Sequence, residues 1–383
     1  MQKFQFNSAR SIEVEKGGSK TLGERLKRFG YRRALIVTDK AIVSTGLIQP
    51  ALDNCQLNNI ETIVFSDVQP DPHESIVSKA TQIAIEHDVD CVVGFGGGSS
   101  MDVAKLAALL ARSGEKLEQI YGVNITKGPR LPLIMVPTTA GTGSEVTPIS
   151  IVTTGDGEKK GVVSSFLIPE LALLDAQLTL GLPQHVSAAT GIDAMVHAIE
   201  AYTSKNLKNP MSDCLAKEAL RLLSGSLHSV CQNGNDLESR ENMLLGACLA
   251  GMAFANAPVA AVHALAYPIG ARFHVSHGLS NALILGPVAS FNLEQAKAQY
   301  AELATIVLPS QRGSQLELAE AFVSYLSGLS ASCGLPTRLR DVGISSADID
   351  RLAEDAMKQT RLLINNPKEV TLKDAKCIYM GVL

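Results

Sequence analysis

Long apolar runs and clustered positive charge are both missing from this sequence. No stretch approaches the roughly eighteen uncharged apolar residues of a membrane-spanning helix, so we expect no contact with a membrane. The opening MQKFQFNSARSIEV lacks the apolar centre of a signal peptide. Lysine and arginine form no run, and the net charge of −4 offers nucleic acid no basic surface. These absences argue against a membrane protein and against a nucleic-acid-binding protein.

Cysteine is sparse and unpatterned. The seven cysteines are scattered, odd in number and include no C-x-x-C pair, which argues against a disulfide framework or a cysteine zinc site. We therefore expect a reducing, cytoplasmic setting. Internal repeats and low-complexity tracts are also missing. The 383 residues, 46% of them hydrophobic and 19% charged, have the composition of a globular protein and suffice for two domains.

The pattern of apolar residues changes once along the chain, near Pro183. Up to Pro183, short apolar runs alternate with helical patterns, which predicts a largely parallel sheet with helices on its faces. Beyond Pro183, apolar residues recur at spacings of three and four with no convincing strand. We predict an α/β domain over 1–183 and an all-helical domain over 184–383. Near the N-terminus, Phe4–Phe6 and Ile12–Val14 are candidates for an edge hairpin.

Three histidines and one aspartate in the second half have the spacing of a metal site. Asp193 and His197 stand four apart, so on a helix they project from one face. His263 and His277 lie on either side of an expected break at Pro268–Gly270. Three imidazoles and one carboxylate suit Fe(II) or Zn(II). Taken singly, each histidine is more simply explained as a half-buried, hydrogen-bonded side chain.

A glycine-rich turn joins a predicted strand to a predicted helix at Gly96, Gly97 and Gly98. Because these residues lack a Cβ, a phosphate can approach the backbone closely. Ser99 and Asp102 have the spacing of a capping box, and the free N–H groups of that helix end would face an anion. The usual G-x-G-x-x-G fingerprint is incomplete, because Ser99 stands where its last glycine belongs. A tight turn without a ligand is the alternative.

Two further stretches follow predicted strands. The loop Pro137–Glu145 offers hydroxyls and small residues that suit contacts to phosphate, ribose or a nicotinamide amide, although an ordinary capped turn is the alternative. Asp39 closes the strand Ala34–Val37. A carboxylate there can accept hydrogen bonds from the adenosine ribose and would repel a 2′-phosphate. It could also be the N-cap of a following helix.

The order D-x-x-x-H and then H-x(13)-H, between Gly191 and Asn281, resembles the iron-containing (group III) alcohol dehydrogenases. The resemblance covers nearly the whole chain. It implies a metal site of Asp193, His197, His263 and His277, with Fe(II) expected and Zn(II) as an alternative. It also implies that 1–183 is an NAD-binding domain similar to that of dehydroquinate synthase, and that 184–383 is the metal-binding catalytic domain.

The same resemblance assigns cofactor contacts in the first half. The GGGS stretch followed by Asp102, Ala104 and Lys105 looks like the family's pyrophosphate loop. Lys160 matches a lysine near the cofactor, although a surface lysine beside Glu158 is the alternative. The residues implied to bind NAD are Asp39, Gly96, Gly97, Gly98, Ser99, Thr138, Thr139, Thr142, Lys160 and Leu178.

This chain departs from the family at Tyr267, where many members carry a histidine one turn after the third ligand. A tyrosine can donate a hydrogen bond, but with an ordinary pKa near 10 it is a poor proton acceptor at neutral pH. We name Tyr267 as the catalytic candidate, and its part in a proton relay is open.

The resemblance implies reversible, NAD-dependent oxidation of a small primary alcohol or diol to an aldehyde by a homodimer or higher homo-oligomer. A lyase of the dehydroquinate synthase type is one alternative, but it would need a basic pocket, and only Arg272 and, more distantly, Lys205 and Lys208 accompany the ligands. Another activity of the family, such as that of a hydroxyacid-oxoacid transhydrogenase, is a further alternative. Zinc-dependent glycerol dehydrogenases resemble this chain less, because they use fewer histidine and carboxylate ligands. The four intact ligands argue against a nucleotide-binding protein without catalysis.

Overall fold

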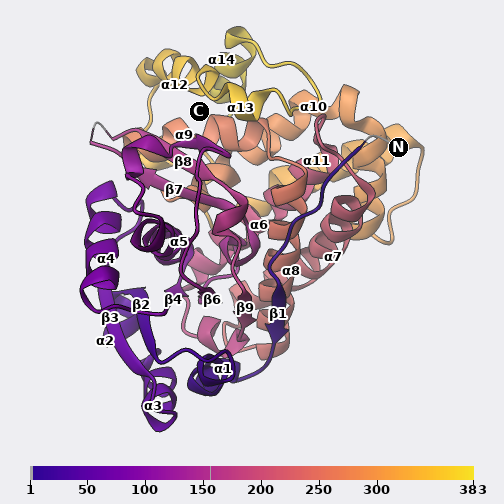
Figure 1. The fold of residues 1–383 in the computed structure, drawn as a ribbon. Helices are drawn as coiled ribbons and strands as arrows, with labels where there is room; N and C mark the ends of the chain where they lie inside the picture. The colour runs from indigo at the N-terminus through magenta and orange to yellow at the C-terminus, as the bar shows by residue number, and fades with distance from the viewer. Residues whose placement is uncertain (1–2, 156) are drawn as a thin grey trace. The chain divides into compact units, whose positions relative to one another are not determined.

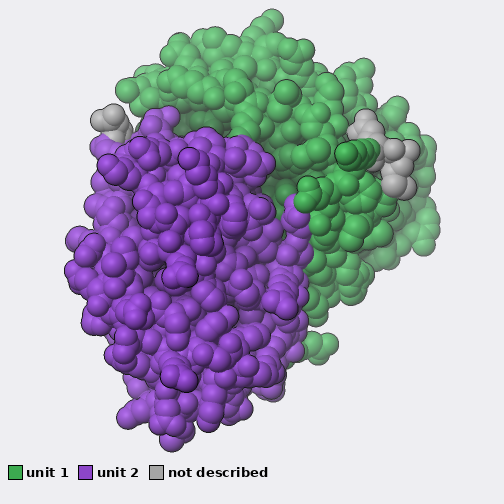
Figure 2. Space-filling model, in the orientation of Figure 1, with its two compact units in different colours: residues 1–6, 182–383 green, residues 7–181 purple. Residues whose placement is uncertain are grey.

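The computed structural model describes residues 3–155 and 157–383, and the chain divides into two compact units. Figure 2 colours them separately: residues 7–181 form one unit, and residues 182–383 form the other together with the N-terminal segment up to Phe6. The division falls after Gly181, two residues before the predicted boundary at Pro183. The predicted fold class, an α/β domain followed by an all-helical domain, is confirmed.

The first unit is built on a six-stranded parallel sheet in the order β1-β9-β6-β4-β2-β3 (Figure 1). Its strands are β1 (Ser11–Val14), β2 (Arg33–Asp39), β3 (Glu61–Val68), β4 (Cys91–Gly96), β6 (Leu133–Pro137) and β9 (Leu171–Leu174). Strands β4 and β6 are buried along their whole length, as continuous apolar runs become when helices cover both faces of a parallel sheet. The carboxyl ends of β2, β4 and β6 therefore lie next to one another.

The expected edge hairpin is wrong. Phe4–Phe6 has no regular structure, and β1 pairs in parallel with β9. The alternating pattern of β1 predicted a strand correctly. Its partner β9 lies far away in the sequence, and a local pattern does not identify a distant partner.

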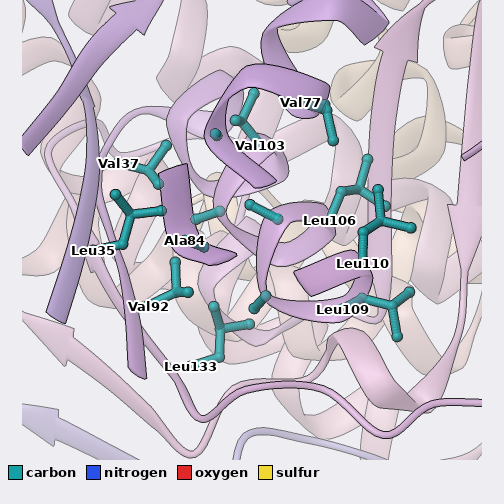
Figure 3. Close-up of a cluster of buried hydrophobic side chains, with 14 of the residues drawn as sticks. Leu35, Val37, Val77, Ala84, Val92, Val103, Leu106, Leu109, Leu110 and Leu133 are labelled. Atoms are coloured by element: carbon teal, nitrogen blue, oxygen red, sulfur yellow. The ribbon is translucent and has the colours of Figure 1, made fainter. Parts of the chain in front are cut away.

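Five helices cover this sheet: α1 (Leu22–Arg28), α2 (Lys40–Ser44), α3 (Gln49–Leu57), α4 (Glu74–Glu86) and α5 (Gly98–Ser113). Because successive residues of a strand point to opposite faces, Leu35 and Val37 join one apolar cluster and Ala34 and Ile36 join another. Figure 3 shows the first cluster, in which strand residues pack against α4 and α5. A smaller three-stranded sheet consists of β5 (Gly122–Val123), β8 (Lys159–Val163) and β7 (Ile149–Thr153).

Residues 182–383 are helical and contain no strand. The helices are α6 (Gln184–Thr203), α7 (Pro210–Gln232), α8 (Leu237–Asn256), α9 (Ala261–Phe273), α10 (His277–Val307), α11 (Gln315–Ser332), α12 (Ile349–Met357), α13 (Thr360–Leu363) and α14 (Leu372–Gly381). Helix α6 is buried on nearly every side over its last four turns, and it packs against α7, α8 and α10. A helix that is apolar all round belongs in the centre of its unit. Side chains on α6 are thus shielded from solvent.

The predicted break at Pro268–Gly270 is also wrong. Helix α9 continues through both residues to Phe273, and the chain turns at His274, which has a φ of 54°. Proline removes one backbone donor from a helix, but Pro268 is buried and the surrounding packing holds the helix together.

Among the described residues, no single helix is both long and apolar enough to cross a membrane. Helices α8 and α9 reach that length and composition only as a pair, which bends by 107° at its junction.

Candidate functional site

Helix α6 carries Asp193 and His197 on the same face, as the spacing of four predicts. His263 lies in the first turn of α9, and His277 is the first residue of α10. Gly278 lets the start of α10 lie directly against α6, because a Cβ there would come within 2.5 Å of the carbonyl oxygen of Ala189. Side-chain size at this position therefore decides how close His277 comes to the other ligands.

The four predicted ligands converge. One donor atom from each of Asp193, His197, His263 and His277 lies within 4.8 Å of the others. Asp193 Oδ1 is 3.9 Å from His197 Nε2, 3.8 Å from His263 Nε2 and 3.5 Å from His277 Nε2. Asp193, His197 and His263 are buried, whereas His277 is only partly covered. Three nitrogen donors around one oxygen can close on a single divalent ion.

The electrostatics of the group keep a negative charge at its centre. Burial by itself raises the pKa of Asp193, but the imidazoles of His197, His277 and His263 and the side chain of Asn281 lower it, and the net direction is downward. Asn281 Nδ2 donates to Asp193 Oδ1 at 2.6 Å and lies 3.2 Å from His277 Nε2. The aspartate is therefore ionised, as a metal ligand must be.

The environment of His263 Nε2 shows whether a metal fits among these four residues. His263 Nε2 is buried and has no hydrogen-bond partner among the described residues. An unsatisfied buried nitrogen is costly and uncommon in proteins. Because it faces the Asp193 carboxylate and two further imidazoles, a divalent cation would satisfy it. The residues present fit Fe(II) or Zn(II).

Tyr267 stands beside the ligands, one turn after His263 on α9. The centre of its ring is 6.5 Å from that of His263, edge to face, and 5.9 Å from that of His277. It is partly buried. The structure thus brings the catalytic candidate to the metal group, and its chemical role stays a prediction.

In the α/β unit the glycine turn and the threonine loop touch. A Cβ on Gly98 would come within 2.8 Å of the Thr142 side chain, and one on Gly97 within 3.5 Å of Thr139 Oγ1. Gly96 has a φ of 155°, which favours glycine. These loops follow β4 and β6, so their proximity results from the parallel order of the strands.

The predicted capping box at Ser99 and Asp102 is wrong. Helix α5 begins one residue after Gly97, which makes no side-chain cap, and the helix already includes Ser99. The Asp102 carboxylate is occupied elsewhere, accepting from Ser144 Oγ at 2.9 Å and from the backbone N–H of Ile151 at 3.0 Å. Gly98 therefore belongs to the helix, and the glycine turn is shorter than the sequence suggested.

Asp39 is the N-cap of α2, which is one of the two roles that the sequence allows. Its Oδ1 accepts from the Ile42 N–H at 3.0 Å and so caps α2, while its Oδ2 lies 3.8 Å from where a Cβ on Gly96 would be. The neighbouring Lys40 is 3.4 Å from Asp67. The carboxylate of Asp39 thus lies next to the glycine turn, where a ribose contact is predicted.

Two predicted cofactor residues have other partners. Lys160 Nζ is 3.5 Å from Glu158 and 5.7 Å from the centre of the Tyr121 ring, and the side chain is substantially exposed. Leu178 is buried in the second apolar cluster of the sheet. Their contacts to a dinucleotide stay predictions.

Comparison with known proteins decides the family. A model of the iron-containing alcohol dehydrogenases matches residues 9–176, and a model of the C-terminal part of the same family matches residues 187–383. The chain belongs to the iron-containing alcohol dehydrogenase family. Its four converging ligands lie in the part of the chain that the C-terminal model matches.

Relatives match along the whole chain. Long-chain-alcohol dehydrogenase 1 of Geobacillus thermodenitrificans is 38% identical, covering 95% of this chain and 92% of that protein. NAD-dependent methanol dehydrogenase of Bacillus methanolicus is 32% identical, covering 97% of each. A solved structure of a 1,3-propanediol oxidoreductase superposes with a TM-score of 0.96 at 32% identity and covers 100% of both chains.

In this member of the family, two residues that contact the ligands were not predicted from the sequence. Glu200 contacts His263, and Asn281 contacts Asp193 and His277. A signal was present in both cases, because Glu200 is seven residues after Asp193 on α6 and Asn281 is four after His277 on α10. Helical spacing thus places each beside a ligand of its own helix.

Proposed function

We propose that this protein catalyses reversible hydride transfer between NAD(H) and a small primary alcohol or diol and its aldehyde. The observation that carries the proposal is the convergence of Asp193, His197, His263 and His277 within 4.8 Å, with His263 Nε2 lacking any other partner among the described residues. A divalent metal held there supplies the Lewis acidity that makes a substrate hydroxyl more acidic. The relatives named long-chain-alcohol dehydrogenase, NAD-dependent methanol dehydrogenase and 1,3-propanediol oxidoreductase support this class of substrate and cofactor.

The residues of the proposed metal site have different roles. Asp193 offsets the positive charge of the metal, and Asn281 holds its carboxylate in place. Tyr267 lies within reach of the group and can donate a hydrogen bond to the substrate oxygen. Its hydroxyl orients the substrate in this proposal.

In the α/β unit, the predicted NAD contacts come from two loops and from the single residues Asp39, Lys160 and Leu178. The N–H groups at the start of α5, beside Gly96, Gly97, Gly98 and Ser99, receive the pyrophosphate. Thr138, Thr139 and Thr142 offer hydroxyl groups to the phosphates, the ribose or the nicotinamide amide. The Asp39 carboxylate accepts from the adenosine ribose, Lys160 lies near the cofactor, and Leu178 packs near the nicotinamide.

The lyase alternative lacks support from charge. Three cations accompany the ligands in the sequence, and two of them have acidic partners: Arg272 donates to Asp355 and Lys208 to Asp213. Arg272 and Lys208 are therefore engaged in ion pairs, which makes them less available to an acidic, phosphorylated substrate. Hydride transfer to a small uncharged substrate needs no such pocket.

The proposal is tested on protein purified without air. Elemental analysis should find about one iron or zinc per chain, as expected for a single four-ligand site. NADH oxidation should follow with at least one member of a panel of short aldehydes and hydroxyaldehydes. If the ion is Fe(II), purification in air should lose activity that anaerobic iron restores, whereas equal activity after both treatments points to zinc. Bound metal without turnover of any aldehyde or alcohol would overturn the proposal.

We further expect a homodimer or higher homo-oligomer in a reducing cytoplasm. All seven cysteines are free thiols, which a reducing compartment preserves. Light scattering on the purified enzyme tests the assembly, and a monomer at micromolar concentration would contradict it.

A further inference from the structure

Glu200 is a buried carboxylate that the ligand set does not include. It lies on α6, three residues after His197 and seven after Asp193, so it faces the same side of the helix. Its side chain accepts three N–H groups. Oε2 accepts from the backbone of Ala260 at 2.9 Å and from His263 Nδ1 at 2.7 Å, and Oε1 accepts from the backbone of Val262 at 2.7 Å.

Two of these contacts fix the start of α9. The N-cap residue of that helix is Ala260, which has no side chain able to cap it. A helix start leaves backbone N–H groups without internal partners and carries partial positive charge. The carboxylate of Glu200 meets both needs from a different helix. Glu200 therefore sets the position of α9 relative to α6.

The third contact decides which nitrogen of His263 carries the proton. Because Oε2 is a hydrogen-bond acceptor and already accepts from Ala260, His263 Nδ1 must be the donor. In the neutral ring, Nε2 then presents its lone pair, 3.8 Å from Asp193 Oδ1 and with no other partner among the described residues. With the proton on Nε2 instead, His263 could not ligate a metal.

We propose that Glu200 is the positioning residue of the metal site, holding His263 in its Nε2-ligating tautomer. One helix then supplies two ligands, Asp193 and His197, and also the group that orients the third. This inference rests on the proposed function, since it assumes that the four residues bind the metal. Loss of such a partner commonly lowers metal affinity by about 10–100-fold.

The test compares Glu200→Gln with Tyr379→Phe. Glutamine keeps the size of Glu200, but its amide NH₂ must face one of the three N–H donors or turn His263 into the wrong tautomer. Tyr379 OH donates to the backbone oxygen of Leu265 on the same helix α9 at 2.6 Å and is fully buried. Tyr379→Phe thus removes a buried hydrogen bond to α9 without touching a ligand.

Metal affinity is measured by anaerobic competition with a chromophoric chelator, and ligand geometry by the visible spectrum of the Co(II)-loaded enzyme. We expect Glu200→Gln to lose about 10–100-fold in affinity and to change the Co(II) spectrum. Tyr379→Phe should keep wild-type affinity and spectrum even if its melting temperature falls. Wild-type affinity and spectrum in Glu200→Gln, or equal losses in both variants, would overturn the proposal.

A second measurement on the wild-type enzyme covers the case in which Glu200→Gln does not fold. In the Co(II)-loaded protein, the proton NMR signal of His263 Nδ1–H should be shifted by the metal and exchange slowly with solvent. Rapid exchange of that signal contradicts the proposal. If the wild-type chain binds no metal at all, the proposed function fails as well; if it binds metal but Glu200 proves indifferent, only this inference fails.

Discussion

Asp193 is the residue at which the three imidazoles meet, since each Nε2 lies between 3.5 and 3.9 Å from its Oδ1. Removing one imidazole leaves three donors and weakens the hold on the ion. We expect His263→Ala and His277→Ala to lose most bound metal and nearly all activity, while circular dichroism shows a retained fold. Metal content and aldehyde reduction are measured on the same preparation. Full activity with stoichiometric metal in His277→Ala would show that the ligand set is wrong.

Tyr267 is near enough to the ligands to act on a substrate, but its geometry does not assign it a proton relay. If it orients the substrate by one hydrogen bond, Tyr267→Phe should lower kcat/KM only modestly. A relay would cost on the order of a hundredfold or more. The pH–rate profile separates these cases, because a group that transfers the proton leaves its own inflection. We expect the modest loss and an unchanged profile.

Asp39 lies beside the glycine turn and caps α2 at the same time. Its charge would repel the 2′-phosphate of NADP. Two unit charges about 4 Å apart at an effective dielectric near 20 interact by roughly 4 kcal/mol. Even a quarter of this corresponds to about a fivefold preference for NAD. We therefore expect a higher kcat/KM with NADH than with NADPH. In Asp39→Gly, the ratio of these two kcat/KM values should be smaller.

The matched control for this prediction is Asp39→Asn. An asparagine keeps an oxygen that can cap α2 but removes the negative charge. Asp39→Asn should lower the ratio of kcat/KM for NADH to kcat/KM for NADPH, without the loss of stability expected for Asp39→Gly. Equal kcat/KM for the two cofactors in the unmodified enzyme would leave Asp39 as a helix cap alone.

At the scale of elements, α5 is tied to the loop that follows β6. Lys105 is fully buried and donates to Ser144 Oγ at 2.8 Å, to Thr147 Oγ1 at 3.2 Å and to the Ile149 carbonyl at 2.9 Å. The Ser144 hydroxyl in turn donates to Asp102. Since α5 begins at the glycine turn, this network sets the distance between the two predicted cofactor loops.

Lys105→Met should therefore destabilise the α/β unit strongly. It leaves Asp102 buried without its cation, a change that typically costs about 3–5 kcal/mol. Weaker NAD binding should accompany the loss, since both loops lose their connection. Chemical unfolding and a cofactor titration measure the two effects, with the exposed Lys79→Met as control. Stability within about 1 kcal/mol of wild type would show that the network contributes little.

The same lysine predicts a pH dependence. Burial lowers the pKa of Lys105 to about 8, against about 10.4 for lysine in an unfolded chain. Between these values the unfolded chain binds more protons, so the free energy of unfolding contributed by Lys105 rises with pH. The difference in stability between wild type and Lys105→Met should widen from about pH 8 to pH 10. A constant difference across that range would contradict the lowered pKa.

In the whole molecule, the metal and NAD should each stabilise a different unit. The metal group belongs to residues 182–383, and the predicted NAD residues belong to residues 7–181. Metal at a hundred times its Kd stabilises whatever binds it by about 2.7 kcal/mol. Anaerobic removal of the metal should speed hydrogen exchange in α6 and at the starts of α9 and α10, and leave β2 and β4 unchanged. NAD should protect the loops after β4 and β6 instead, as mass spectrometry would show.

Local sequence patterns are sufficient to predict those features that depend on residues close together in the chain. Periodicity along the chain is enough to distinguish the buried strands of the first unit from the helices of the second. The spacing of Asp193 and His197 is enough to place both side chains on one helix face, because a helix repeats about every 3.6 residues. The pairing with His263 and His277 came from the resemblance to a family, since no local rule connects segments so far apart.

Tertiary structure alone decided the contacts between distant segments. It brought Glu200 to His263 and Asp102 to Ser144, joined β1 to β9, and carried α9 through Pro268. In two of these cases a local preference gave way to packing: a capping box gave way to a loop contact, and a proline break gave way to burial. The physical reason is that a buried polar group requires a hydrogen-bond partner and an apolar face must be buried against another element. Which partner lies nearest depends on how the whole chain packs.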